Sequence, residues 1–209
     1  MLTARAQGWT ARLRGFARGA APQQRCELCS APVRADHRHL FDVSRRRLLC
    51  SCQACAVLFG GAGQYRLVPA RGRPLSGFRL SDAQWDALQI PIDIAFFVKS
   101  TAQVRVVALY PGPAGTTESL LDLSAWEELQ GANPVLAEFE PDVEALLVNR
   151  AHGAREYYRV PIDACYALSG IIRVRWRGLS GGAEAWAAIR AFFAELQGGV
   201  RAADRGSHA

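Results

Sequence analysis

The motifs CELC (26–29) and CSCQAC (50–55) decide the N-terminal fold, because they hold five of the six cysteines in this 209-residue chain. They contain two C-x-x-C pairs, and 22 residues (30–51) separate one pair from the other. This spacing places four thiolates at the corners of a tetrahedron, as in structural zinc ribbons and rubredoxin-like iron sites. The sequence therefore predicts a metal site.

We take the cysteines of the two pairs as the ligands: Cys26, Cys29, Cys52 and Cys55. Cys50 is the alternative ligand, because it lies two residues before Cys52 on a strand-like run and therefore shares its face. His37 and His39 lie in the intervening loop and compete as ligands, although four cysteines need no histidine. A cluster that uses all five cysteines is a further alternative.

Zinc is the expected ion and iron the alternative. Four-cysteine sites in a reducing compartment are mostly structural zinc sites. In addition, Ser30 and Ala56 follow the second cysteine of each pair, where iron-binding turns usually have glycine. The module is too short to bury a core by itself, so we expect the ion to replace hydrophobic burial. A closed shell of four thiolates leaves no position for a substrate, and we assign no catalytic residue.

The charge is strongly segregated along the chain. The net charge is +6, but residues 1–79 hold 14 Arg against three acidic residues, whereas residues 80–209 hold 11 basic and 16 acidic residues. A basic half of this kind favours an acidic protein surface or nucleic acid as partner. No apolar run is long enough for membrane insertion, and the arginine-rich N-terminus lacks the apolar core of a secretory signal, so we expect a cytoplasmic protein.

Four segments follow from composition and turn signals. We expect a basic N-terminal segment at 1–24, a four-cysteine metal-binding ribbon at 25–62, an α+β domain at 78–198 and a flexible tail at 199–209.

The second part of the chain mixes strand and helix patterns without strict alternation, which predicts an α+β fold with a mainly antiparallel sheet. The strand-like runs are 94–98 and 104–110, and the runs 144–150 and 155–160 form a hairpin. Pro111–Thr117 is expected to be a loop. We expect a helix over 120–130 with Ser124 as an internal N-cap, and a last helix for which Ser180 is the N-cap.

Other candidates for chemistry have simpler interpretations. Cys165 stands on an apolar helix pattern and is expected to be a buried structural thiol. The carboxylates between 138 and 144 are expected to form a solvated face. Arg45, Arg46 and Arg47 flank the second cysteine pair and support nucleic-acid binding as an alternative, but aromatic residues for base stacking are sparse there.

The cysteine-bearing run from 25 to 59 and motifs such as FRLSDAQWDALQIPIDIAFF (78–97) and GLSGGAEAWAAIRAFFAEL (178–196) resemble an uncharacterised bacterial family. The resemblance implies an association with gene clusters for nickel–iron hydrogenases. The resemblance spans about residues 25–197 and carries no established activity. It implies a cytoplasmic accessory role in hydrogenase assembly or maturation, with a hydrogenase subunit as partner.

We therefore expect a non-catalytic metal-binding accessory or adaptor protein that docks on a protein partner. A rubredoxin-like iron carrier of electrons or metal is the first alternative. A nucleic-acid-binding zinc-ribbon protein is the second.

Overall fold

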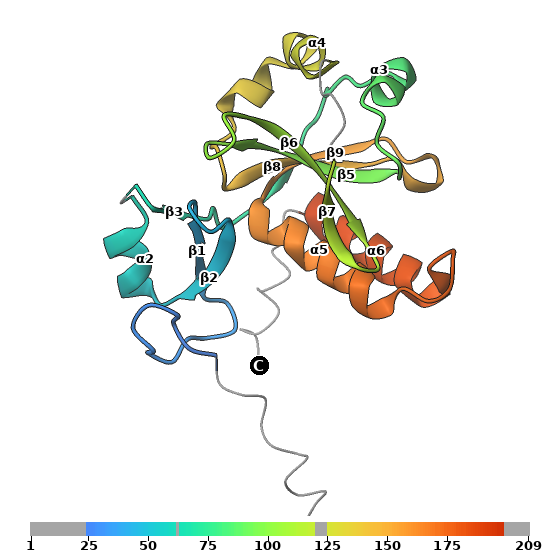
Figure 1. Cartoon of the computed structure of the whole chain (residues 1–209). Helices are drawn as coiled ribbons and strands as arrows, with labels where there is room; N and C mark the ends of the chain where they lie inside the picture. The colour runs from blue at the N-terminus through green and yellow to red at the C-terminus, as the bar shows by residue number, and fades with distance from the viewer. Residues whose placement is uncertain (1–23, 62, 120–124, 199–209) are drawn as a thin grey trace, which may run out of the picture.

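The computed structural model describes residues 24–61, 63–119 and 125–198, which form two antiparallel sheets and their covering helices (Figure 1). The small sheet has the strand order β2-β1-β3, with β1 at Arg38–Asp42, β2 at Arg47–Ser51 and β3 at Tyr65–Leu67. The large sheet has the order β4-β9-β8-β5-β6-β7, with β4 at Arg73–Pro74, β5 at Ile94–Ser100, β6 at Arg105–Gly112, β7 at Gly115–Glu118, β8 at Glu144–Asn149 and β9 at Glu156–Pro161.

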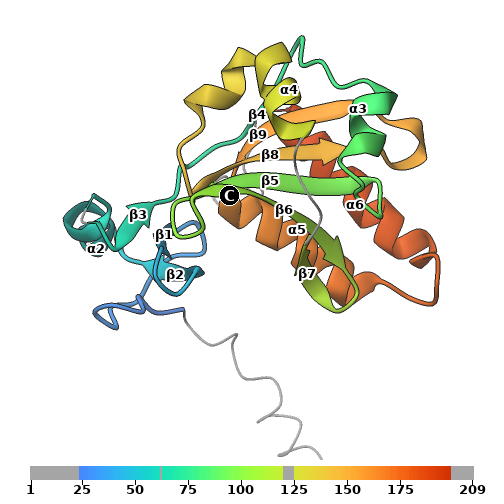
Figure 2. The same cartoon turned by 45° about the horizontal axis from the view of Figure 1, so that its top comes forward.

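The helices lie on both faces of the large sheet. The helices of the whole described chain are α2 at Gln53–Phe59, α3 at Asp82–Ala87, α4 at Ala125–Ala132, α5 at Ile162–Arg175 and α6 at Gly182–Gln197. Two short 3-10 helices are η1 at Pro134–Glu138 and η2 at Ala151–Gly153. Helices α3 and α4 cover one face and α5 and α6 the other, while α2 belongs to the small module with β1, β2 and β3 (Figures 1 and 2).

Burial on both faces explains the continuous apolar runs of the central strands. Along β5, Ile94 and Phe96 face α5 and α6, whereas Ala95 and Phe97 face α3 and α4. Phe97 stacks on Trp126 of α4 at 5.3 Å between ring centroids. Because neither face meets water, the strand does not need polar residues at alternate positions.

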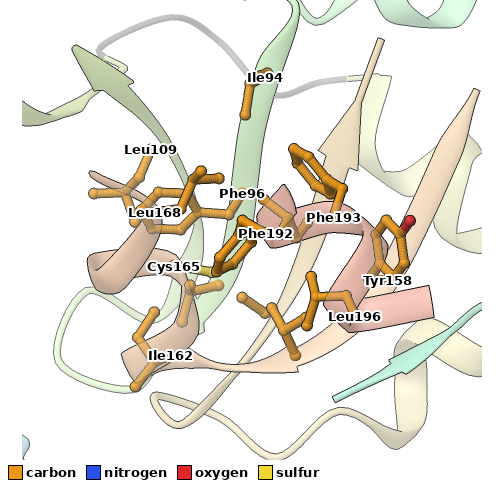
Figure 3. Packing of buried hydrophobic residues seen from close by; sticks show 14 of the residues in the cluster. Ile94, Phe96, Leu109, Tyr158, Ile162, Cys165, Leu168, Phe192, Phe193 and Leu196 are labelled. Carbon is orange, nitrogen blue, oxygen red and sulfur yellow. The ribbon is translucent and has the colours of Figure 1, made fainter. Parts of the chain in front are cut away.

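The larger core lies between the sheet and the helix pair α5–α6. Figure 3 shows Phe192 and Phe193 of α6, Cys165 and Leu168 of α5 and Phe96 of the sheet in this core. Cys165 is fully buried in this core, as the apolar pattern around it predicts.

The small module is joined to this core. Phe41 of β1 and Val68, just after β3, belong to the same apolar cluster as the α5–α6 side of the sheet. Two arginines of the module also form ion pairs with the sheet domain: Arg46 with Glu118 at 3.0 Å, and Arg66 with Asp142 at 3.2 Å. The core therefore anchors one side of the β1–β2 hairpin.

The expected α+β fold with an antiparallel sheet is confirmed, and so is the hairpin formed by the runs at 144–150 and 155–160, which are β8 and β9. The expected loop at Pro111–Thr117 is wrong. Most of it belongs to the β6–β7 hairpin, in which Pro111 pairs with Thr116. Pro111 is tolerated because it lies towards the edge of the sheet, beside the last strand in the order.

Two predicted caps have different outcomes. Ser180 is not the N-cap of α6, because Gly181, with φ 85°, occupies that position and makes no side-chain cap bond. Ser124 lies outside the described residues, and so do residues 1–23 and 199–209, which contain the predicted basic segment and tail.

Replacing Phe96 by Ala is expected to lower the free energy of unfolding by about 3–5 kcal/mol, because it removes a fully buried ring from a packed core. Val104→Ala is the matched control, since Val104 is 90% exposed and its replacement is expected to change stability little. Urea titration followed by circular dichroism measures both. Equal effects of the two substitutions would contradict the packing described here.

Candidate metal centre

The four cysteines of the two C-x-x-C pairs lie together at one end of the small module. Their sulfur atoms are all within 4.8 Å of one another. Cys26 and Cys55 are buried, Cys52 is half-buried and Cys29 is exposed. The Sγ atoms of Cys29 and Cys52 are 3.7 Å apart, far beyond the roughly 2.05 Å of a disulfide, so the cysteines are free thiols.

The first pair sits on a tight turn before β1. The Ser30 amide donates to the Cys26 carbonyl at 2.8 Å, and the Cys26 amide donates to the Ala31 carbonyl at 2.8 Å. Ser30 has a φ of 62°, the left-handed conformation that glycine adopts most easily. The turn thus takes the shape of a cysteine knuckle although serine stands where glycine is usual.

The second pair begins helix α2. Cys52 is the N-cap of this helix, and its sulfur accepts a hydrogen bond from the Cys55 amide at 3.4 Å. Cys52 thereby does what a serine or aspartate oxygen does at other helix starts. The geometry that caps α2 is the same geometry that directs both sulfurs of the pair to one point.

The protein environment favours a negative charge on one sulfur of this thiol cluster, that of Cys26. Burial raises the pKa of the Cys26 thiol, but N–H groups of Cys52, Leu28 and Cys29 point at its sulfur and together lower the pKa to about 6. Burial and hydrogen bonds to the neighbouring thiols raise the pKa of Cys55 to about 12. Without an ion, a negative charge on the Cys26 sulfur therefore makes it harder for the Cys55 thiol to lose its proton.

A dication among the sulfurs removes this conflict, because it favours the charged form of all four thiols. The donor set fits a soft or borderline ion, and four thiolates form a closed tetrahedral shell. The residues present therefore suit a bound metal ion.

Cys50, His37 and His39 form a second group beside the first. One donor atom from each of them lies within 4.8 Å of the other two. Cys50 groups with the two histidines and not with the four cysteines, and burial, followed by the charges of Glu27 and Cys26, raises the pKa of its thiol. The structure thus separates the alternative ligands of the sequence from the four-cysteine set.

Two supporting residues give no signal in the sequence. The Glu27 carboxylate accepts a hydrogen bond from the Cys50 amide at 2.7 Å, and Asp163 of α5 lies 2.8 Å from Nδ1 of His39. Asp163 is 124 positions from His39, so only the fold brings them together.

The three consecutive arginines beside the second cysteine pair are ion-paired. Arg45 pairs with Asp42 at 3.4 Å, Arg46 with Glu118 at 3.0 Å and Arg47 with Glu27 at 3.6 Å. These carboxylates partly neutralise the arginine charges, which weakens the attraction of the three side chains for phosphate groups.

The acidic stretch near β8 is likewise engaged with arginines. The carboxylate of Glu144 accepts hydrogen bonds from Arg159, and Glu140 pairs with Arg66 at 3.2 Å. The expected solvated face is thus only partly solvated, because Glu144 and Asp142 are buried.

Residues 25–200 match the model of a family of unknown function, DUF5947. No curated protein and no solved structure matches the chain. The matched range includes both cysteine pairs as well as the large sheet, so the family model covers the metal module and the sheet domain together. Among the described residues, no helix is both long and apolar enough to cross a bilayer.

Replacing Cys55 by Ser is expected to abolish metal binding at the four-cysteine site, because it removes a buried sulfur from the four-thiol cluster. Cys165→Ala is the control, since Cys165 is also buried but lies in the α5–α6 core. Elemental analysis of the purified proteins, together with a thiol count, measures the effect. Unchanged metal content in the Cys55 variant would contradict the assignment.

Removing the ion with a chelator is expected to release the module selectively. Amide exchange should rise in β1, β2 and α2, whereas β5 and β8 in the buried sheet should stay protected. Hydrogen-exchange mass spectrometry compares the segments in one sample. Equal protection of the module before and after chelation would exclude a structural ion.

Proposed function

The chain belongs to the family DUF5947, and we propose that it is a non-catalytic accessory protein in which a structural zinc ion shapes a surface for docking on a partner protein. The observation that carries this proposal is the link between the cysteine cluster and helix α2. Cys52 and Cys55 lie at the start of that helix, and its last turn exposes three apolar side chains.

The exposed side chains are consecutive and large. Val57 is 71% exposed, Leu58 70% and Phe59 38%, and we call these three residues the α2 patch. A run of three exposed apolar residues favours association and lowers solubility unless a partner covers it. Helix α2 lies on the outer side of the module, away from the large sheet, where a partner has access to it (Figure 1).

The ion explains how so short a helix holds this patch in place. Helix α2 has seven residues and buries only Cys55 and Ala56. Isolated helices of this length are unstable in water. A zinc ion bound to Cys52 and Cys55 would fix the first turn, and the remaining helix would follow from it.

The charge of the N-terminal part indicates the kind of partner. Residues 1–79 carry a net charge of +11, which complements an acidic protein surface with an apolar centre. The family resemblance implies a hydrogenase subunit in this role. Nucleic acid is less well supported, because the α2 patch is mainly aliphatic and offers only the ring of Phe59 for stacking on a base.

Replacing Leu58 by Asp is expected to reduce partner binding at least tenfold, because it places a charge in the middle of the α2 patch. Val104→Asp is the matched control, since Val104 is 90% exposed but lies on the large-sheet domain. The measurement is co-purification of hydrogenase subunits with the tagged full chain, in a host that carries the hydrogenase genes.

Retention of the subunits by the wild type and the Val104 variant, and loss by the Leu58 variant, is the expected result. Failure of the wild type to retain them, or unchanged hydrogenase activity after deletion of the gene, would overturn the hydrogenase role. An iron-loaded, visibly coloured and reversibly reducible protein would favour the carrier alternative instead.

A further inference from the structure

We propose that His37, His39 and Cys50 form a second metal site, which binds a divalent transition-metal ion through three protein ligands and leaves one coordination position open. This inference is independent of the docking function. It rests on the cross-strand geometry of the β1–β2 hairpin and on the hydrogen bonds that orient the two imidazoles.

The hairpin places the three residues together. In the antiparallel register of β1 and β2, His39 lies directly opposite Cys50. His37 precedes β1 by one residue, and its ring centroid is 4.8 Å from that of His39. Side chains opposite each other in such a ladder are close enough to share one ion.

The hydrogen bonds leave the Nε2 atom of both rings available for coordination. Nδ1 of His37 lies 2.7 Å from the Arg34 carbonyl oxygen, which only accepts hydrogen bonds, so Nδ1 carries the proton. Nδ1 of His39 lies 2.8 Å from an Asp163 carboxylate oxygen and donates to it in the same way. In each neutral ring Nε2 therefore has a free lone pair.

The second, independent observation is an unsatisfied nitrogen. Nε2 of His37 is buried, and no described residue forms a hydrogen bond with it. A buried polar atom without a partner is costly, so this nitrogen requires an explanation. Histidines that bind metals show this arrangement: one ring nitrogen donates to a carbonyl or carboxylate while the other faces the ion.

The ligand set defines the class of ion. Two imidazoles and one thiolate suit zinc and other divalent transition metals, whereas calcium and magnesium prefer oxygen ligands. Three protein ligands leave the fourth position to water or an added ligand, as in catalytic zinc sites. The side chain of His39 is 26% exposed, so the group borders on solvent. The second site thus differs in kind from the closed four-cysteine site.

The second ion would also connect the module to the sheet domain. His39 belongs to β1, whereas Asp163 belongs to the first turn of α5. Asp163 is therefore a positioning residue that acts through His39. Phe41 lies on the same face of β1 as His39 and packs in the core beside α5. This packing holds the strand that carries His39 in place.

The test is a titration of the metal-free full chain with Zn²⁺ and, in parallel, with Co²⁺, whose spectrum distinguishes thiolate-rich from imidazole-rich sites. The wild type is expected to bind two ions per chain, one in an all-sulfur environment and one in a mixed environment. His37→Ala and Cys50→Ala are expected to bind one ion with the all-sulfur spectrum. His152→Ala, a histidine outside both groups, should still bind two.

Asp163→Asn separates positioning from ligation. It should leave two ions per chain at saturating zinc but weaken the second by about 10–100-fold. A single ion per chain in the wild type would overturn the proposal, and this result does not depend on the folding of any variant. So would two ions in the Cys50 variant, or loss of the all-sulfur spectrum in the His37 variant, which would assign the histidine to the first site.

Discussion

The convergence of four sulfur atoms on one point is the constraint on which the N-terminal half of this protein depends. The sulfurs come from two turns that lie 23 residues apart. Without an ion, the pKa of the Cys26 thiol is lowered whereas that of the Cys55 thiol is raised, so the four thiols do not ionise together. Apolar side chains stabilise both faces of the hairpin: Phe41 and the nearby Val68 enter the core of the sheet domain, and Leu40 and Leu49 are buried on the opposite face. Helix α2, beside the cysteine turns, buries only Cys55 and Ala56, so an ion bound to the four sulfurs would add the link that this small buried area lacks.

The register of the β1–β2 hairpin links the two groups of metal-binding side chains. Leu40 pairs with Leu49 on the buried face towards α2, and His39 pairs with Cys50 on the face towards α5. A shift by one residue would exchange these faces and separate both groups. The same hairpin therefore fixes the four-cysteine cluster, the His37–His39–Cys50 group and the contact with α5.

The sequence was sufficient for features that depend on local pattern and not for those that depend on distant contacts. The spacing of the cysteines predicted which four come together, and β-branched and aromatic runs predicted β5, β6, β8 and β9. The β6–β7 hairpin was missed because Pro111 and Gly112 indicate a turn when their position near a sheet edge is unknown. Asp163 could not be foreseen as the partner of His39, because a helix far along the chain supplies it.

The most direct test of the central claim, a four-thiolate ion that organises the module, is X-ray absorption at the metal edge of the full chain carrying His37→Ala, which removes the proposed second site, loaded with one equivalent of zinc. The account predicts a first shell of four sulfur atoms at about 2.3 Å, the usual zinc–thiolate distance. A first shell containing nitrogen or oxygen at about 2.0–2.2 Å would contradict it, because the ion would then not be held by the four cysteines alone.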